Sequence, residues 1–352
     1  MSASLPVFEV TRGHLVESFH SGSIAVVDSA GKLIASYGDP QSVAFLRSSA
    51  KPFQALPFVE RGGVEHFHYT ACELALSCAS HNGARIHLDT VREMQSKVGI
   101  GENDLRCGGH LPSDAAMLRE FIEENRIPTN NVNNCSGKHT TMLAHAKMRG
   151  LPLENYLELD HPIQQDILTT LSEMCGMARD KVEIGIDGCS APNFAMPLYN
   201  AALGMARLCD PRDLADSRAA ACKKITTAMT TQPEMISSPG EFDCELMKTG
   251  EGQIVTKRGA EGFQIAGLMP ETPDGRGIGI AFKVIDGDAS RLNDELESTS
   301  RVRPAVTLEI LRQLDRLNGT QLRSLEKFGP EKELRNYAGI PTGRSYPVFR
   351  LA

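Results

Sequence analysis

Apolar residues recur along this chain in two different periods, which predict short strands near both ends and a long helical middle. Alternating or short apolar runs bounded by turn residues predict strands at 7–10, 23–28, 32–37, 182–186, 253–257 and 277–284. The strand at 182–186 is expected to be buried. The first three strands follow one another through tight turns, so we expect them to pair antiparallel.

Helical periodicity dominates from residue 52 to about residue 208. The periodic runs lie at 53–59, 71–78, 86–98, 114–125, 138–149, 162–174 and 193–206, and an amphipathic helix is expected at 303–317. We therefore expect an α/β fold, with a mixed sheet from both chain ends flanked by helices and a helical subdomain. Residues 1–352 would form a single domain, in which 1–60 and 250–352 contain the sheet and 61–249 are mainly helical.

Composition narrows the class of protein. The chain is 41% hydrophobic and 23% charged with a formal charge of -7, and it has 5% aromatic residues and no tryptophan. This balance is typical of a globular protein and argues against a nucleic-acid partner, so a small-molecule partner is favoured. No basic, apolar leader is visible at 1–10 and no run approaches about 18 apolar residues. The expected location is cytoplasmic.

Ser48 stands one helical turn ahead of Lys51 in the run RSSAKPF of residues 47–53. This spacing brings a lysine amine within reach of a serine hydroxyl. The same SxxK pattern occurs at Ser29, in a predicted hairpin turn, and at Ser324, in a charged C-terminal helix. Only Ser48 precedes an apolar helical segment that could anchor the pair. The structural alternative is a helix N-cap serine beside a surface lysine.

Two further motif parts follow Ser48 in the order that serine acyl transfer by an SxxK enzyme requires. Ser80 begins the sole SxN triplet of the chain, and a KTG-like triplet must then lie on a strand. Lys248 begins a literal KTG but precedes a predicted turn, whereas Lys257 ends a predicted strand. We therefore favour Lys257 and keep Lys248 as its rival.

A lysine can activate a serine only when its amine is neutral. The ordinary lysine pKa is about 10.4, so a base that works near pH 7 needs a pKa lowered by roughly 3 units, or about 4 kcal/mol. Burial and a second cation lower a lysine pKa in this way. Two lysines converging on two serines, with Arg47 adjacent, would supply that second cation.

Two of the nine cysteines stand in glycine-containing turns that precede helical runs. Cys135 lies in NNCSGKH (133–139) and Cys189 in GIDGCS (185–190). Backbone N–H groups at such turns lower thiol pKa values, so the two thiolates could share a zinc ion completed by His139, Asp187 or a water. The alternative is two phosphate- or substrate-binding turns with small buried thiols. Five cysteines are expected in the core, namely Cys72, Cys78, Cys175, Cys209 and Cys222, while Cys107 and Cys244 stay undecided.

Five ordered runs together make the sequence resemble the Rhizobium-type L-asparaginases, the asparaginase II family. The runs are RSSAKPFQ (47–54), SCASHNG (77–83), NNCSGKHTTML (133–143), GIDGCSAPNFAMPL (185–198) and KRGAEG (257–262). The resemblance extends from about Val7 to Phe349. It implies an L-asparaginase, an amidohydrolase that converts L-asparagine to L-aspartate and ammonia. The implied fold is similar to serine β-lactamases and penicillin-binding proteins, and the implied assembly is a homodimer.

The resemblance also implies a set of site residues. Two serine–lysine pairs fall on Ser48 with Lys51 and on Ser80 with Lys257. A Zn²⁺ site falls on Cys135, Lys138 and Cys189, with Asp187 placed to pair with Lys138 and His139 at its border. Candidate contacts to the substrate are Arg47, Asn82, Asp187 and His139.

We expect Ser48 to attack the amide carbon with Lys51 as base, while Ser80 and Lys257 relay protons, although exchanged roles stay open. The backbone N–H of Ser48 is a candidate oxyanion donor. Zinc is expected to shape the pocket around the substrate rather than generate hydroxide. Two alternatives stay open, another serine–lysine amidase, esterase or β-lactam-interacting hydrolase, and a non-catalytic zinc or amino-acid sensor.

Overall fold

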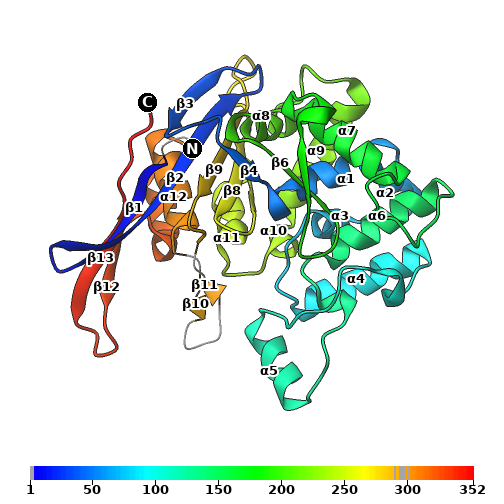
Figure 1. Cartoon of the computed structure of the whole chain (residues 1–352), viewed down its shortest axis with the longest axis horizontal. Helices are drawn as coiled ribbons and strands as arrows, with labels where there is room; N and C mark the ends of the chain where they lie inside the picture. Colours follow the sequence, from blue (N-terminus) through cyan, green and yellow to red (C-terminus); the bar gives the residue numbers. More distant parts are fainter. Residues whose placement is uncertain (1–3, 289–290, 293–297, 300) are drawn as a thin grey trace.

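The computed structural model describes residues 4–288, 291–292, 298–299 and 301–352. Within these residues, eight strands form one sheet in the order β12-β13-β1-β2-β9-β8-β7, with β3 paired to β2 (Figure 1). The strands are β1 Leu5–Arg12, β2 Leu15–Asp28, β3 Leu33–Tyr37, β7 Ile254–Arg258, β8 Phe263–Leu268, β9 Ile278–Val284, β12 Lys332–Arg335 and β13 Pro341–Pro347. Both ends of the chain supply strands, which confirms the predicted α/β class.

The pairing within this sheet differs from the expected mixed arrangement. Every described pair of neighbouring strands in it is antiparallel. The consecutive strands β1 and β2, β2 and β3, and β7 and β8 are joined by connections of only a few residues. A parallel pair needs a crossover of about a dozen residues or more, so these connections impose antiparallel pairing.

Each face of the sheet packs against its own set of helices. On β2, Ile24 and Val26 belong to the core around α12, while Ala25 and Val27 belong to the core around α8. Successive side chains of a strand point to opposite faces, so one apolar run serves both cores. Covering both faces buries the second half of β2 together with most of β8 and β9, and it fixes the strand β7 that carries Lys257.

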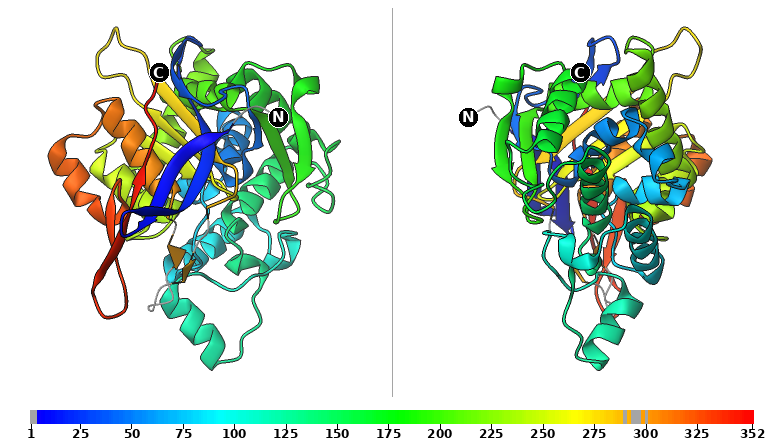
Figure 2. Two further views of the ribbon diagram at one scale, coloured as in Figure 1. Left: turned by 60° about the vertical axis from the view of Figure 1, so that its left-hand side comes forward. Right: turned by 90° about the vertical axis from the view of Figure 1, so that its right-hand side faces the viewer.

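Most of the helices between residues 51 and 249 gather beside the sheet (Figure 2). The helices are α1 Lys51–Glu60, α2 Gly63–His66, α3 Ala71–Ser77, α4 Arg85–Val98, α5 Ala115–Glu123, α6 Ser136–Met148, α7 Pro162–Cys175, α8 Leu198–Cys209, α9 Asp216–Thr231, α10 Pro233–Ile236, α11 Phe242–Thr249, α12 Arg303–Gln313 and α13 Gly319–Ser324. The five 3₁₀ segments among the described residues are η1 Arg47–Ala50, η2 Glu102–Asp104, η3 Asn130–Val132, η4 Arg179–Lys181 and η5 Glu326–Phe328. No helix among the described residues combines the length and apolarity that crossing a bilayer requires.

Several predicted elements change in the structure. The expected helix at 193–206 is divided, because Pro192–Pro197 form β6 and the helix α8 begins at Leu198. In a small second sheet, β6 pairs with β4 (Val43–Phe45) and β5 (Glu183–Ile186). The strand β5 is largely exposed rather than buried, because it is an edge strand. The C-terminal helix α12 ends at Gln313 instead of residue 317.

Candidate active site

The segment from Leu46 to Lys51 connects the small sheet to helix α1. The Leu46 N–H donates to the Phe194 carbonyl at 2.9 Å, and the Arg47 N–H donates to Asn193 Oδ1 at 3.1 Å. Arg47 has φ of 53°, a left-handed conformation that a non-glycine residue adopts only when its surroundings enforce it. The 3₁₀ turn η1 begins at this residue, and the Lys51 N–H donates to the Ser48 carbonyl. Ser48 and Lys51 are therefore held one turn apart.

Two buried lysines converge on one serine. The Lys51 amine donates to Ser80 Oγ at 2.9 Å, and the Lys257 amine lies 2.8 Å from the same oxygen. Both lysine residues are 0% exposed and Ser80 is 4% exposed. Lys51 also donates to the carbonyls of Ala79 and Asn134. Ser80 therefore connects the two amines, and a proton can pass between them through its hydroxyl.

Long-range contacts place Lys257 at this point. Its carbonyl accepts a hydrogen bond from the Ser49 hydroxyl at 2.8 Å, so the strand β7 is tied directly to the SxxK turn. The Ser80 N–H donates to the Ile236 carbonyl at 3.0 Å. The rival Lys248 lies on α11 and pairs with Glu234 at 2.9 Å, outside the cluster. The structure thus brings Lys257, and not Lys248, to Ser80.

Burial lowers the pKa of both lysines. The pKa of Lys257 is lowered well below its ordinary value by desolvation, then by the charge of Lys51 and, to a smaller extent, by that of Arg258. Desolvation also lowers the pKa of Lys51, although the nearby Cys135 opposes this. A lowered pKa favours the neutral amine, the form that can accept a proton from a serine.

The Ser48 hydroxyl has a different environment from that of Ser80. Ser48 is half-buried, and its hydroxyl makes no hydrogen bond to any residue that the structure describes. Its position one turn before Lys51 leaves the oxygen free to meet a reacting carbon. Contacts to a base are often long in a free enzyme and shorten in the substrate complex. The two serines are therefore distinct, one accessible and one bridging.

Cys135, Lys138 and Cys189 form a second cluster beside Lys51. The Lys138 amine donates to Cys189 Sγ at 3.0 Å, and each of the three residues is at most 4% exposed. A hydrogen bond from the Cys135 thiol is the largest cause that holds the pKa of Cys189 far below its ordinary value. Burial opposes the charge of Lys138, but the charges of Cys189 and Cys135 outweigh it and raise the Lys138 pKa.

The donor types of this cluster bear on metal binding. Among the described residues, no group of three or more histidine, cysteine, aspartate or glutamate side chains could hold a metal ion. The cluster contains two thiols and an amine, so only its cysteines belong to these four residue types. Thiolate is a preferred ligand of zinc, and a lysine can join it only when its amine is neutral.

Arg47 and Asp187 face each other in an ion pair. Arg47 Nε lies 2.7 Å from Asp187 Oδ1, so the predicted ion pair of Asp187 with Lys138 is replaced by one with Arg47. The reason is local, because the left-handed turn at Arg47 directs this side chain toward the loop after β5. The Asp187 charge still contributes to the raised pKa of Lys138. Both residues remain partly exposed.

The other two candidate substrate contacts are His139 and Asn82. His139 is fully buried, and the Tyr156 hydroxyl contacts its Nδ1 at 2.6 Å. Burial lowers the pKa of His139 to about 4, so this ring is neutral near pH 7. Asn82 accepts the Ala84 N–H at 3.0 Å in a local turn and lines a separate cavity. His139 adjoins the thiol cluster, where it interacts with Cys189. Asn82 instead lies at the separate cavity, away from that cluster.

Arg258 is a residue of the site to which the sequence had given no role. Its guanidinium pairs with Glu241 at 2.7 Å and donates to the Ser80 carbonyl at 3.3 Å. The backbone N–H of Arg258 donates to Asp243 Oδ2 at 2.8 Å. The run KRGAEG drew attention to this segment, but only the fold shows that Arg258 contacts Ser80. Tyr156 was missed in the same way, because no local pattern links it to His139.

The remaining cysteines are free thiols in the core. Burial raises the pKa of Cys78, Cys107, Cys175, Cys222 and Cys244 to about 12, and it raises the pKa of Cys72 and Cys209 as well. A thiol with a raised pKa is neutral and unreactive near pH 7. The two undecided residues, Cys107 and Cys244, therefore resemble the core thiols rather than Cys189. Cys72 is only partly buried.

Comparisons with known proteins add a family and several similar structures. The profile of the family described as L-asparaginase II matches residues 8–347. No curated protein matches the chain at a significant level. A Bacillus subtilis glutaminase, YbgJ, in covalent complex with 5-oxo-L-norleucine is similar over 85% of this chain and 89% of that one, with 13% identity and a TM-score of 0.37. A Bacillus glutaminase solved in 4.3 M NaCl has 13% identity, coverage of 84% and 91%, and a TM-score of 0.38. A structure named Mglu in its native form has 15% identity, coverage of 86% and 67%, and a TM-score of 0.42.

Proposed function

The chain belongs to the L-asparaginase II family, and on this premise we propose that it hydrolyses the side-chain amide of L-asparagine to L-aspartate and ammonia. The observation that carries the proposal is the convergence of Lys51 and Lys257 on Ser80. Lys51 itself stands one turn after Ser48. Such a centre suits acyl transfer, which needs a nucleophilic hydroxyl and a neutral amine.

The proposed reaction has two steps. Ser48 Oγ attacks the amide carbon, Lys51 takes the hydroxyl proton, and that proton is delivered to the nitrogen that leaves as ammonia. Water then attacks the resulting ester, which releases L-aspartate and restores Ser48. Ser80 and Lys257 extend the path that protons can follow from Lys51. The Ser48 N–H, in the first turn of η1, is a candidate donor to the oxyanion.

The exchanged assignment, with Ser80 as nucleophile, is the second candidate. It is favoured by the direct contacts of both amines with Ser80 Oγ at 2.8 and 2.9 Å. Against it, Ser80 is 4% exposed, whereas Ser48 is half-buried and its hydroxyl has no partner among the described residues. The accessible hydroxyl is the better nucleophile for an external substrate.

The Arg47–Asp187 ion pair suits an amino-acid substrate. L-Asparagine carries an α-carboxylate and an α-ammonium group, which match a guanidinium and a carboxylate respectively. In the free protein the two side chains form an ion pair with each other, with 2.7 Å between Arg47 Nε and Asp187 Oδ1. When L-asparagine binds, its α-carboxylate can pair with Arg47 and its α-ammonium group with Asp187. Neither side chain is then left as an unpaired charge, which limits the free-energy cost of separating the two.

Ammonia release from L-asparagine by the purified protein tests the proposed function, with a parallel reaction on L-glutamine. Glutamine is one methylene longer, a difference that a pocket discriminates by about 1–3 kcal/mol. Release from asparagine at the higher kcat/KM would support the proposal. A higher value for glutamine would make the protein a glutaminase, and no release from either amide would reject the amidase.

We also propose that Cys135, Lys138 and Cys189 bind Zn²⁺. Their two thiols and one amine lie together, and Cys189 favours its thiolate form. The ion would act as a Lewis acid when bound, and its charge would favour a neutral Lys138. The cluster adjoins Lys51, whose pKa both cysteines influence, so its residues help to shape the wall of the reaction site.

Removal of zinc by a chelator is expected to raise KM for L-asparagine more than it lowers kcat, because the cluster positions the pocket rather than the nucleophile. Metal content measured by mass spectrometry should fall in Cys135→Ser and stay unchanged in Cys72→Ser, whose thiol lies on α3 outside the cluster. Complete loss of turnover would contradict a positioning role for the metal. Absence of zinc from the freshly isolated protein would reject the site.

Arg258→Gln is expected to move the acidic limb of the kcat/KM profile to higher pH. The Arg258 charge helps to lower the pKa of Lys257, so its removal raises that pKa and the neutral amine forms only at higher pH. The pH dependence of kcat/KM measures this shift. Arg85→Gln is the matched control, because Arg85 pairs with the distant Glu120. A shift in the control equal to that in Arg258→Gln would remove the electrostatic explanation.

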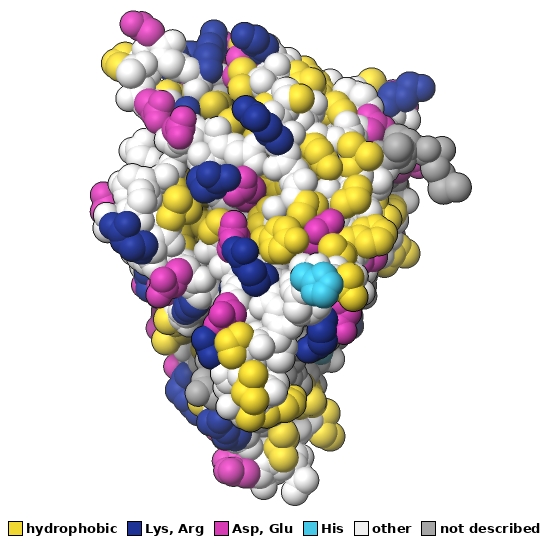
Figure 3. Space-filling model, turned by 90° about the vertical axis from the view of Figure 1, so that its left-hand side faces the viewer, with side chains coloured by type: hydrophobic (Ala, Val, Ile, Leu, Met, Phe, Trp, Pro, Cys, Tyr) yellow, Lys and Arg dark blue, Asp and Glu magenta, His cyan; other side chains and the backbone are white. Residues whose placement is uncertain are grey.

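We propose a homodimer as the working assembly. Apolar side chains gather on the face of the molecule formed by β1 and β2 (Figure 3). Leu15 is 64% exposed and Phe19 is 59% exposed on β2. Exposed apolar area of this kind marks surfaces that associate. Light scattering of the purified protein checks the proposal, and a monomeric mass across the micromolar range would reject it.

A further inference from the structure

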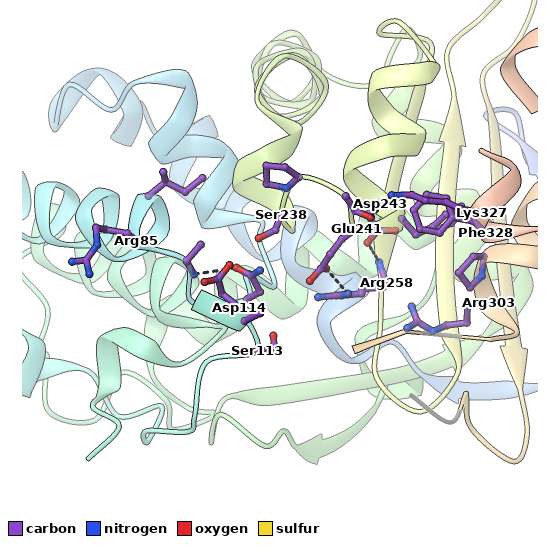
Figure 4. Close-up of a pocket in the computed structure, with 18 of the residues that line it drawn as sticks. Arg85, Ser113, Asp114, Ser238, Glu241, Asp243, Arg258, Arg303, Lys327 and Phe328 are labelled. Atoms are coloured by element: carbon purple, nitrogen blue, oxygen red, sulfur yellow. Dashed lines mark hydrogen bonds and ion pairs between the residues drawn. The ribbon is translucent and has the colours of Figure 1, made fainter. Parts of the chain in front are cut away.

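A cavity of about 610 Å³ lies between α4, α11, α12 and the turn η5 (Figure 4). Its volume falls within the roughly 300–1,000 Å³ of typical ligand pockets. Ser48, Lys51, Ser80 and Lys257 do not line it. It reaches the serine–lysine centre only through its walls, where Asn82 follows Ser80 by two residues and Arg258 donates to the Ser80 carbonyl.

The carboxylates that line this cavity already have partners. Glu241 pairs with Arg258 at 2.7 Å. Asp243 accepts from the Arg258 N–H at 2.8 Å and from Gln264 Nε2 at 2.9 Å. Asp114 caps α5 by accepting the Met117 N–H at 2.9 Å. The acidic groups of the wall are therefore occupied by cations or N–H donors.

Two lysines of the wall lack a carboxylate partner among the described residues. The Lys327 amine donates to the Gly240 carbonyl at 3.0 Å and lies 4.7 Å from the centre of the Phe328 ring. The Lys332 amine makes no hydrogen bond or ion pair to the described part of the chain, and burial lowers its pKa. The neighbouring Glu331 and Glu333 pair instead with Arg344 and Arg335. The wall therefore contains two amines without an ion-pair partner among the described residues, whereas its three arginines pair with carboxylates.

A buried hydroxyl adds an unused donor to the same wall. Ser238 is 4% exposed, and its Oγ has no hydrogen-bond partner among the described residues. Ser238 is directed toward the cavity, across from Asp114 (Figure 4). It stands two residues before Gly240, whose carbonyl binds Lys327. Buried polar groups are normally hydrogen-bonded, so this hydroxyl points to a missing partner.

Two aromatic side chains give the cavity wall an apolar part. The rings of Phe242 and Phe328 meet edge to face with centroids 5.2 Å apart. We propose that this cavity binds a small organic anion, with its charged group held by Lys327, Lys332 and Ser238 and its apolar body packed on Phe242 and Phe328. The proposal does not depend on the amidase activity, because none of the four serine–lysine residues lines the cavity.

Isothermal titration calorimetry with octanoate tests the proposal on the full chain, with 1-octanol and acetate as matched probes. Octanoate carries both an anion and an apolar body, whereas each of the other two probes carries only one of them. We expect saturable octanoate binding, at least about tenfold tighter than octanol or acetate, which corresponds to about 1.4 kcal/mol. The double variant Lys327→Gln/Lys332→Gln should weaken octanoate binding at least about tenfold.

The control is Lys223→Gln, the same chemical change at an exposed lysine of α9 that does not line the cavity. It should bind octanoate as the original protein does. Ser238→Ala is a milder variant for the case that the double variant fails to fold. It should also weaken octanoate binding. Absence of saturable binding, equal binding of octanol, or unchanged binding in both folded cavity variants would overturn the proposal. Octanoate binding without hydrolysis of either L-asparagine or L-glutamine would reject the amidase and keep this site.

Discussion

A Ser48→Ala protein is expected to lose asparagine hydrolysis by roughly 10⁴-fold or more, because the nearby hydroxyls of Ser49 and Ser80 already form hydrogen bonds. Lys51 and Lys257 both donate to Ser80, so removing the Ser48 hydroxyl leaves the proton path intact and removes only the proposed nucleophile. The variant should still bind substrate, since the Arg47–Asp187 pair is untouched. Steady-state ammonia release measures the loss.

Ser324→Ala is the matched control, since Ser324 begins another SxxK pattern but lies exposed at the end of α13. It should keep the full rate. A diazoketone analogue of L-asparagine then separates nucleophile from relay, because the attacking oxygen forms a bond to its carbon as dinitrogen leaves. Peptide mapping should find the adduct on Ser48, also in a Ser80→Ala protein. An adduct on Ser80 would exchange the two roles.

Local sequence signals predicted the helices well, because their information lies within a few residues. The amphipathic helix expected at 86–98 is α4, which is followed by Gly99 in the left-handed conformation typical of a helix end. The run expected at 162–174 is α7, which begins at Pro162 and is likewise followed by a left-handed Gly176. Such caps and periods need no distant partner, so they can be read from the sequence.

Elements that depend on distant partners were harder to predict. The strand β13 pairs with β1 from the far end of the chain, matching Tyr346 with Glu9. The sequence predicts helix for the residues of β6, since its apolar residues Phe194 to Met196 run on into α8 without a polar break. Only the pairing with β4 and β5 decides its conformation. β-structure is set by context more than by intrinsic preference.

The candidate site shows the same division. The motifs singled out Ser48, Lys51, Ser80 and Lys257, because each stands in a short recognisable run. They could not show that both lysines meet at Ser80, since this contact joins residues 29 and 177 positions apart. Nor could they reveal Arg258 on the Ser80 carbonyl, or the pairing of Arg47 with Asp187. These contacts are tertiary, and they decide which charges act on Lys257.

Lys257→Met is expected to lower the hydrolysis rate by about 10²–10⁴-fold and to stabilise the fold at the same time. The rate falls because one of the two amines on Ser80 is lost, and general acid–base groups contribute in this range. Stability rises because the variant no longer buries an amine whose neutral form the folded state prefers, while Ser80 Oγ keeps its hydrogen bond from Lys51.

The stability effect has a defined dependence on pH. The pKa of Lys257 in the folded protein lies well below the ordinary value of 10.5, so below pH 10.5 the unfolded chain binds a proton that the folded chain does not. The original protein therefore loses stability as pH falls from 10.5 toward the folded pKa, by at most about 1.4 kcal/mol per pH unit from this group. Lys257→Met lacks this loss, so its advantage in the free energy of unfolding should grow as pH falls from 10 to 7.

Urea unfolding at several pH values measures this difference in the free energy of unfolding between Lys257→Met and the original protein. Lys248→Met, at the exposed lysine that pairs with Glu234, should show no such gain, and an equal gain in both variants would mean that the burial of Lys257 is not its cause.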